Sequence, residues 1–502
     1  MVLLSGNIRF FDTTLRDGEQ TPGVSLNPGQ KLEIATMISD IGVHVVEVGS
    51  VAASDGEREA LRLISDAGLN AEVCTYVRAV SQDIDSAADY GADSVHLVIP
   101  VSDLHIEKKM RKTRAQICEM AFSAVTYARE RGLIVELSGE DASRADPAFL
   151  REIYAGGLER GAERLCFCDT VGLLTPERVA EVIPQLCLAP LSIHCHDDLG
   201  MAMANTVAAL RAGAGCAHVT VNGIGERAGN TPLEELVMTL ELLYRHPTGI
   251  RTEEIYRLSS LVSRMTGVPL PTNKAIVGEM AFTHESGIHA HGVLREPSTY
   301  EPVPPERVGR KRRIMLGKHS GSASVEAALA EMHYHPDESQ LKEILKRIKV
   351  LGDKGSRITD TDLIAIAEAV MAIECRPKLK MKQFTVVSGS NVIPTASVTM
   401  DVRGEEVTGA STGAGPVDAA MEALRRSVAA VADIRLEEYH VDAIHGGTDA
   451  LVDVTVRLSK DGKIITSRGA RTDIIMASVE AVIAGMNRLL REENEDRSQN
   501  TH

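Results

Sequence analysis

A pattern that repeats eight times in the first half of the 502-residue chain constrains the fold most. In each repeat, a short run of β-branched and other apolar residues ends in polar residues, and an amphipathic stretch follows. Strands that alternate with helices predict a parallel sheet. Eight such units in about 250 residues match the size of a TIM (β/α)8 barrel. The predicted strands are residues 8–14, 43–49, 71–77, 93–99, 133–138, 164–169, 191–196 and 217–222.

A doubly wound sheet is the alternative arrangement of the same elements. Its usual dinucleotide-binding form is excluded because no Gly-x-Gly-x-x-Gly follows the first strand. The amphipathic stretches, such as residues 30–41, 113–131 and 176–186, are predicted to form the outer helices. We therefore favour the closed barrel.

The repeat stops near residue 272, and the remaining chain changes character twice. A segment rich in Gly, His, Pro and Arg is followed by a helical one, and a basic stretch at 376–382 precedes a β-rich region. That region contains two related units of strands, each closed by a helix that is expected to follow a Gly-rich turn, at Gly413 in the first unit and Gly469 in the second. It is an α+β domain with a polar tail that we expect to be unstructured from residue 492. The predicted domains are a catalytic barrel at 1–271, linker subdomains at 272–325 and 326–380, and a regulatory domain at 381–502.

Composition excludes several classes of partner. A net charge of -16 disfavours binding to nucleic acid and to anionic membranes. No apolar run reaches the roughly 20 residues that span a bilayer. The 8 cysteines form no Cys-x-x-Cys pair, and we interpret them as core residues of a cytoplasmic protein.

Polar residues stand at or just after the end of nearly every predicted strand. The active site of a TIM barrel lies at the carboxyl ends of its strands, so these side chains are expected to converge. This convergence predicts an enzyme. The residues are Asp12, Arg16, Asp17, Glu47, His96, Glu140, Arg144, Asp169, Thr170, His194, His196 and Asn230.

His194 and His196 are the clearest candidate metal ligands. Residues i and i+2 of a strand point to the same side, so both imidazoles face one way and Cys195 faces the other. Asp17 could add a carboxylate and Asn230 an amide oxygen, which gives a mixed N/O site suited to Zn²⁺, Mn²⁺ or Mg²⁺. The alternatives are structural histidines, a simple Asp-Gly turn at Asp17 and an Asx turn at Asn230.

Glu140 and Arg144 have two interpretations from the residues alone. They could act as an acid/base group and an anion-binding partner, or they could form an ordinary ion pair on a loop. The spacing favours neither.

Five motifs, taken together, resemble the 2-isopropylmalate, citramalate and homocitrate synthases. The resemblance extends from about residue 7 to residue 490. The motifs are Phe11-Asp-Thr-Thr-Leu-Arg-Asp-Gly-Glu-Gln-Thr-Pro-Gly-Val, His194-Cys-His-Asp-Asp-Leu-Gly-Met-Ala-Met-Ala-Asn, Gly223-Ile-Gly-Glu-Arg-Ala-Gly-Asn, His284-Glu-Ser-Gly-Ile-His and Leu316-Gly-Lys-His-Ser-Gly.

The resemblance implies a metal-dependent condensation of acetyl-CoA with a 2-oxo acid. It implies that Arg16 polarises the keto group and that Glu140 is the acid/base residue for the acetyl methyl. It also implies a homodimer in which the partner subunit's site receives His289 and Tyr300. The metal ligands would be Asp17, His194, His196 and Asn230, and the other substrate-binding residues His96, Arg144 and Thr170.

Residues after the second strand favour pyruvate as the 2-oxo acid. The sequence Glu47-Val-Gly-Ser-Val-Ala resembles the citramalate branch, whereas members that use 2-oxoisovalerate commonly have Gly-Phe-Pro there. The C-terminal domain resembles the end-product sensor of the family, with Asp418 and Asp473 at its two helix starts. Isoleucine is the expected inhibitor, and leucine is the alternative. A lyase on the same barrel and a non-catalytic amino-acid sensor are competing functions.

Overall fold

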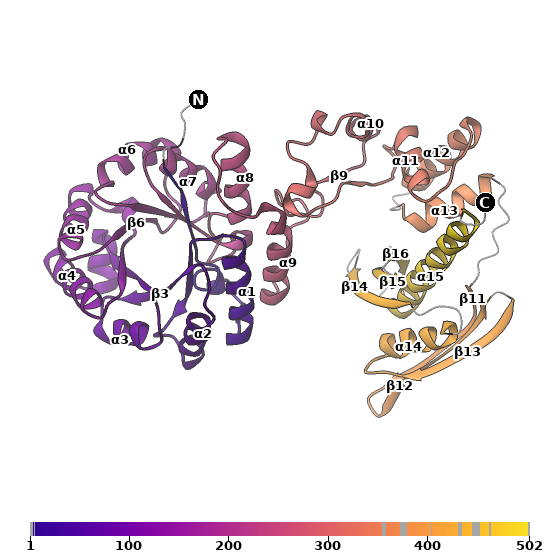
Figure 1. The fold of residues 1–502 in the computed structure, drawn as a ribbon, viewed down its shortest axis with the longest axis horizontal. Helices are drawn as coiled ribbons and strands as arrows, with labels where there is room; N and C mark the ends of the chain where they lie inside the picture. The colour runs from indigo at the N-terminus through magenta and orange to yellow at the C-terminus, as the bar shows by residue number, and fades with distance from the viewer. Residues whose placement is uncertain are drawn as a thin grey trace. The chain divides into compact units, whose positions relative to one another are not determined.

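The computed structural model describes residues 4, 6–353, 358–371, 379–402, 404–429, 434–443, 452–460 and 463–499 (Figure 1). The chain divides into two compact units. The first comprises Met1–Thr283 and Glu301–Arg313, and the second comprises His284–Tyr300 and Ile314–His502.

The first unit contains the predicted barrel. Eight parallel strands pair in sequential order, and β1 also pairs with β8 to close the sheet, which rules out the doubly wound alternative. All eight predicted strands are confirmed, with ends that differ by a few residues. The strands are β1 (Arg9–Asp12), β2 (Val45–Ser50), β3 (Glu72–Arg78), β4 (Ser94–Pro100), β5 (Ile134–Glu140), β6 (Arg164–Asp169), β7 (Leu191–Cys195) and β8 (Cys216–Val219).

A ring of helices surrounds these strands (Figure 1). Local sequence defines several of their starts. Asn27 and Thr113 each form a capping box, and proline occupies the first turn of α1, α5 and α6, where its missing N–H costs least. The helices are α1 (Pro28–Asp40), α2 (Asp55–Asp66), α3 (Ser81–Asp89), α4 (Arg114–Glu130), α5 (Pro147–Glu159), α6 (Pro176–Leu186), α7 (Ala202–Arg211), α8 (Leu233–Leu243) and α9 (Ile255–Thr266).

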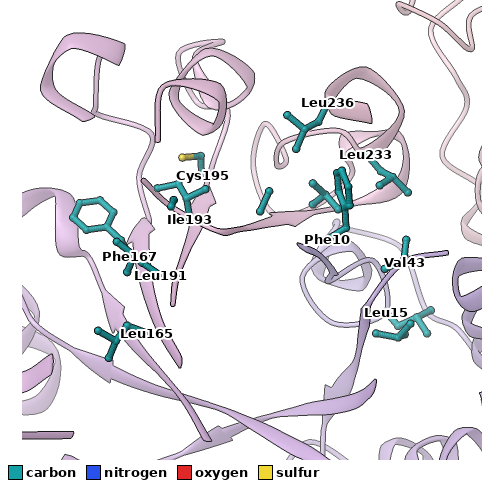
Figure 2. Close-up of a cluster of buried hydrophobic side chains, with 14 of the residues drawn as sticks. Phe10, Leu15, Val43, Leu165, Phe167, Leu191, Ile193, Cys195, Leu233 and Leu236 are labelled. Atoms are coloured by element: carbon teal, nitrogen blue, oxygen red, sulfur yellow. The ribbon is translucent and has the colours of Figure 1, made fainter. Parts of the chain in front are cut away.

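The strands send alternate side chains to opposite sides of the barrel wall. Phe10, Phe167 and Ile193 belong to the main apolar cluster, which the helices complete (Figure 2). The residues next to them along each strand point to the barrel interior. On that inner side, Phe11 of β1 and Cys216 of β8 belong to a separate, much smaller apolar group. Most other inward positions are buried polar residues. The interior of this barrel is therefore largely polar. A buried polar group costs free energy unless it is hydrogen-bonded or paired with an opposite charge.

After α10 (Gly287–Arg295), the described residues of the second unit form three helices and then two similar β-rich parts. Each part is a three-stranded antiparallel sheet followed by a helix, which confirms the predicted internal repeat. The three helices are α11 (Ser322–Glu331), α12 (Glu338–Asp353) and α13 (Asp360–Met371). The β-rich parts are β11 (Leu379–Gly389), β12 (Val392–Val402), β13 (Glu405–Thr412) and α14 (Pro416–Val428), then β14 (Arg435–Ala443), β15 (Val452–Lys460), β16 (Lys463–Arg471) and α15 (Ile474–Gln499).

Two expectations for this unit are wrong. Gly469, interpreted as part of a turn, lies in β16, and Gly409 occupies the same place in β13. A Cβ at either glycine would strike the backbone of the helix packed on the sheet, so these glycines permit close packing. The predicted unstructured tail is also wrong up to Gln499, because α15 continues through residues of high helix propensity.

Short elements connect the barrel to the helices of the second unit. They are β9 (Thr283–His284), α10 (Gly287–Arg295) and β10 (Arg313–Ile314), with β9 and β10 forming a two-stranded sheet. The predicted boundary at 376–382 falls partly outside the described residues, and the division into four domains stays a prediction. Within the described ranges, no helix combines the length and the apolar character that crossing a membrane requires.

Candidate active site

Three of the predicted metal ligands meet at the carboxyl ends of the barrel strands. The Nε2 atoms of His194 and His196 are 3.2 Å apart, and Asp17 Oδ2 lies 3.5 Å from the first and 3.8 Å from the second. All three side chains are buried. Cys195, between the two histidines, faces the outer apolar cluster as the strand alternation predicts (Figure 2).

Asn230 completes this group. It is bridged to His196 through the backbone, and its Nδ2 donates to Asp17 Oδ1 at 3.0 Å. Its Oδ1 is buried and has no hydrogen-bond partner among the described residues. A buried amide oxygen normally accepts a hydrogen bond, so this atom is available to a ligand. One carboxylate, two imidazoles and one free amide oxygen are a donor set that a divalent cation can use.

Local structure explains why Asp17 points into the barrel. The chain turns sharply after β1, with the backbone N–H groups of Arg16 and Asp17 donating to the carbonyl oxygen of Thr13 at 3.1 and 2.9 Å. Burial would raise the pKa of Asp17, but the guanidinium of Arg16 and the two histidines hold it well below its usual range. Burial and the neighbouring His194 lower the pKa of His196 to about 4. Near neutral pH, Asp17 is therefore ionised and His196 is neutral, as metal ligation requires.

Arg16 lies between two carboxylates. Its Nη1 is 2.8 Å from Asp17 Oδ2, and its Nε is 2.8 Å from Glu47 Oε2. Glu47 in turn contacts His96 Nδ1 at 2.6 Å. Burial would raise the pKa of Glu47, but Arg16 and His96 lower it, so the carboxylate is charged and fixes the guanidinium.

His96 is held entirely by protein groups. Its second ring nitrogen, Nε2, lies 2.6 Å from Ser138 Oγ, and the side chain is buried. Burial would lower its pKa, but Glu47 raises it to about 9. His96 therefore supports Arg16 through Glu47 in this structure, and its direct contact with substrate stays a prediction.

The predicted acid/base residue pairs with a lysine, and not with Arg144. Glu140 Oε1 lies 2.5 Å from Lys109 Nζ, a residue of the π-helical turn His105–Met110 that follows β4. Arg144 instead pairs with Asp141 through a 2.8 Å contact. The ion pair between Glu140 and Arg144 that the sequence left open is not formed.

Thr170 joins the ends of two neighbouring strands. Its Oγ1 accepts a hydrogen bond from Asp141 N at 2.8 Å, and its carbonyl oxygen accepts one from Arg227 at 2.8 Å. Asp141 has a left-handed backbone, with φ of 63°, so the chain reverses direction directly after Glu140. The hydroxyl of Thr170 is thus held beside the loop that carries Glu140.

His289 and Tyr300 lie in the second unit and contact each other. Their ring centroids are 4.3 Å apart at an angle of 41°, and both side chains are exposed. Asp418 and Asp473 are also exposed, and both hydrogen-bond to local backbone. Asp418 accepts from Ala414 N, and Asp473 accepts from Ile475 N and Met476 N.

A second polar network lies nearer the amino ends of the strands. Glu136 Oε1 contacts His218 Nε2 at 2.7 Å, and its Oε2 contacts Arg164 Nε at 3.0 Å. Arg164 also binds Glu72 with both terminal nitrogens, and Glu72 contacts Arg9. None of these five residues is among the predicted site residues. The available signal was a charged residue inside an otherwise buried strand, as at Glu136 in Ile134-Val-Glu-Leu-Ser.

Comparison with known proteins covers nearly the whole chain. Residues 7–262 match the HMGL-like family, 276–356 the homocitrate synthase post-HMGL domain-like family, and 357–490 the LeuA allosteric (dimerisation) domain. The last match supports oligomerisation and regulation, and the first, together with the buried donor group, supports a divalent metal.

Three relatives are similar over nearly their full length. A putative (R)-citramalate synthase of Methanoculleus marisnigri is 74% identical over 501 residues, which is 100% of each chain. One of Methanosarcina acetivorans is 57% identical over 95% of this chain and 100% of its own. The (R)-citramalate synthase of Methanocaldococcus jannaschii is 51% identical over 96% of this chain and 99% of its own. Because the HMGL-like model matches residues 7–262 and these relatives match nearly the whole chain, the chain belongs to the (R)-citramalate synthases of the HMGL-like family.

Proposed function

We propose that this protein condenses acetyl-CoA with pyruvate to give (R)-citramalate and CoA. The observation that carries the proposal is the group formed by Asp17, His194, His196 and Asn230 beside Arg16, in a chain that matches (R)-citramalate synthases along its whole length. The reaction forms a bond between the acetyl methyl carbon and the keto carbon. Water then cleaves the thioester and releases CoA and a proton.

The four donors fit a divalent metal because they are buried, contribute both imidazole and oxygen ligands, and leave Asn230 Oδ1 without a partner. When bound, Mn²⁺, Mg²⁺ or Zn²⁺ would polarise the keto group and offset the charge that develops on its oxygen. Asn230 already contacts this group, because its Nδ2 donates to Asp17 Oδ1.

We propose that Arg16 holds the keto oxygen of the 2-oxo acid. Its Nε and Nη1 are bound by Glu47 and Asp17, which fixes the plane of the guanidinium and aims the remaining nitrogen. A charged donor fixed before substrate arrives stabilises developing negative charge without reorganisation. We assign Arg16 this catalytic role.

Glu140 is our candidate for the base that removes a proton from the acetyl methyl. It ends β5 at the same end of the barrel as the metal ligands, and it is half-buried, so it is shielded and still reachable. Lys109 must release or share this carboxylate when substrate binds. Thr170 and Arg144, held by Asp141 on the neighbouring loop, are our candidates for contacts to the substrate carboxylate.

We further propose that the active protein is a homodimer in which His289 and Tyr300 serve the partner subunit's site. Support comes from the dimerisation-domain match and from the contact between these two exposed rings on α10 and just after it. Isoleucine is the proposed inhibitor, leucine the alternative, with Asp418 and Asp473 near the effector. We place the enzyme in the cytoplasm because the described cysteines are free thiols, which suits a reducing compartment.

The test is CoA release from acetyl-CoA by the full chain with Mn²⁺, Mg²⁺ or Zn²⁺. We expect pyruvate to have a higher kcat/KM than 2-oxoisovalerate or 2-oxoglutarate. A higher value for 2-oxoisovalerate would assign 2-isopropylmalate synthesis, and one for 2-oxoglutarate homocitrate synthesis. 2-Oxoisovalerate has two more carbons than pyruvate, and since each methylene in an apolar pocket is worth about 1–3 kcal/mol, the preference should be at least about 10-fold.

A further inference from the structure

Lys31 is a lysine of α1 whose side chain is only 1% exposed. A buried ammonium costs free energy unless oppositely charged groups surround it. Its Nζ lies 2.5 Å from Glu19 Oε2 and 2.5 Å from Glu57 Oε1, and it donates to the carbonyl oxygen of Leu15 at 3.3 Å. Leu15 and Glu19 belong to the loop after β1, and Glu57 belongs to α2. Together with α1, which carries Lys31, one buried charge therefore joins three separate segments.

Two of these partners flank the dipeptide Arg16-Asp17. Leu15 immediately precedes it, and Glu19 follows two residues after it. The carbonyl oxygen of Leu15 also accepts from Gly49 N at 3.2 Å, and Glu19 Oε1 accepts from Leu26 N at 2.8 Å. Lys31 therefore holds both sides of the turn that presents Arg16 and Asp17 to the barrel interior.

The backbone of β2 leaves room for the ion pair between Lys31 and Glu57. Gly49, at the end of β2, has a left-handed φ of 45°, and a Cβ there would overlap the carboxylate of Glu57. The same Cβ would lie 3.2 Å from Lys31 Nζ. A residue larger than glycine would displace Glu57 from the ammonium, so the backbone of β2 is shaped around the ion pair.

A second lysine in the same unit offers a comparison. Lys274 is 13% exposed and also contacts two carboxylates, Glu234 at 3.2 Å and Glu235 at 2.8 Å. Both of its partners belong to α8, and neither lies in the loop after β1. Lys274 thus resembles Lys31 in charge and in its number of carboxylate partners, and differs in what it holds.

We propose that Lys31 is a positioning residue that fixes the Leu15–Glu19 turn, and with it the guanidinium of Arg16 and the carboxylate of Asp17. Lys31 touches neither the donor group nor the keto-binding nitrogen of Arg16, and it acts through Leu15 and Glu19. The consequence for catalysis rests on the proposed function. The mechanical part of the proposal, that Lys31 holds this turn, does not.

The first test is hydrogen–deuterium exchange of the full chain, comparing wild type with Lys31→Met, Glu19→Gln and Lys274→Met. We expect amides of residues 13–21 to exchange at least about 10-fold faster in Lys31→Met and Glu19→Gln, because local opening no longer breaks the ion pair. Lys274→Met should leave these amides at the wild-type rate. Wild-type exchange at 13–21 in both Lys31→Met and Glu19→Gln would overturn the proposal. Glu19→Gln keeps the test decisive if Lys31→Met does not fold, since it preserves the shape of the side chain.

The second test is Mn²⁺ binding by calorimetry, without substrates. We expect the Kd of Lys31→Met and Glu19→Gln to rise about 10- to 100-fold, as for other residues that orient metal ligands, with Lys274→Met unchanged. A lower Tm with unchanged Mn²⁺ affinity would mean that Lys31 only stabilises the fold, and would overturn the positioning role. If wild type itself binds no Mn²⁺, the proposed metal centre fails, and the exchange experiment still decides whether Lys31 holds the turn.

Discussion

Two polar networks lie inside one barrel, and they differ in how completely their atoms are paired. The carboxyl-end network contains seven residues around the donor group, and the amino-end network contains five. Both are mostly buried and built from carboxylates, histidines and arginines. The first comprises Arg16, Asp17, Glu47, His96, His194, His196 and Asn230, and the second Arg9, Glu72, Glu136, Arg164 and His218.

In the amino-end network, both oxygens of Glu136 and both oxygens of Glu72 contact a charged or histidine partner. Among the described residues, that network leaves one buried side-chain atom without a partner, His218 Nδ1. The carboxyl-end network leaves three, His194 Nδ1, His196 Nδ1 and Asn230 Oδ1, and ligand atoms of Asp17, His194 and His196 lie within 4.8 Å of one another. Glu136 and His218 also form part of a four-residue group that could geometrically hold a metal, but Arg164 already neutralises Glu136. The larger number of unpartnered atoms, and not burial or residue type, therefore distinguishes the proposed ligand site from the amino-end network.

The largest expected effect follows from removing a ligand of the carboxyl-end network. Asp17→Asn keeps the size of the side chain and removes its charge, so both metal affinity and the orientation of Arg16 suffer. We expect kcat/KM to fall by about 10³-fold or more, since metal polarisation of a carbonyl is worth several kcal/mol. The fall in kcat/KM is measured from steady-state CoA release with saturating Mn²⁺.

Cys195→Ala is the matched control for that variant. It changes the residue between the two histidines, but on the outer face of the same strand. We expect activity within about twofold of wild type and a small loss of Tm, as for removal of a small buried group. Equal losses of activity in Asp17→Asn and Cys195→Ala would contradict the assignment of the donor group.

In the amino-end network, we expect a substitution to lower the stability of the barrel and to leave metal affinity unchanged. Arg164→Met leaves Glu136 and part of Glu72 buried without a cation, and breaking such a pair costs about 3–5 kcal/mol. Chemical denaturation of the barrel should show this loss, while Mn²⁺ affinity stays at the wild-type value. Arg129→Met, which breaks an exposed pair with Glu163, should cost less than about 1 kcal/mol. A large change in Mn²⁺ affinity for Arg164→Met would remove the distinction between the two networks.

The sequence predicted the first network far better than the second. Asp17, His196 and Asn230 follow strand ends and His194 lies one residue before the end of β7, and the barrel fold brings strand ends together. Glu136 and His218 lie within strands, where alternation alone does not tell which face is the barrel interior until all eight strands are in register. Lys31 was missed for a related reason. It lies on a helix 14 residues after Asp17, and only tertiary structure brings it under the turn.

The two buried histidines should respond to pH in opposite directions. Glu47 raises the pKa of His96 from 6.5 to about 9, so its contribution to stability is full below pH 6.5 and is lost as pH rises through 9. Burial lowers the pKa of His218 despite Glu136, so its contribution is present above pH 6.5 and is lost as pH falls. The His96 contribution amounts to about 3 kcal/mol.

Thermal unfolding between pH 5 and pH 10 tests this contrast. His96→Gln should flatten the alkaline fall of Tm, and His218→Gln should flatten the acid fall. Each variant will also lower Tm at all pH values, because a buried glutamate loses a partner, so the slope is the quantity to compare. If both variants changed the pH dependence of Tm on the same side of neutral pH, the proposed difference in pKa between His96 and His218 would be contradicted.

The smallest expected effect concerns the helix starts of the second unit. Asp473 accepts hydrogen bonds from Ile475 N at 2.8 Å and Met476 N at 3.0 Å, and Asp418 accepts one from Ala414 N at 2.8 Å. Replacing a capping aspartate with alanine costs about 0.5–2 kcal/mol, so Asp473→Ala should lower the stability of this unit by about 1 kcal/mol. Asp418→Ala, which loses one bond to a turn, should cost less. Neither change should alter kcat/KM without effector.

Inhibition by isoleucine then separates two roles of Asp473. If the midpoint of inhibition, which is the isoleucine concentration that halves the activity, is unchanged in Asp473→Ala, Asp473 is only a helix cap. If the midpoint rises while the stability loss stays near 1 kcal/mol, the same carboxylate also contacts the effector, and the exposed polar groups of this unit, like Asn230 in the barrel, are held ready for a ligand.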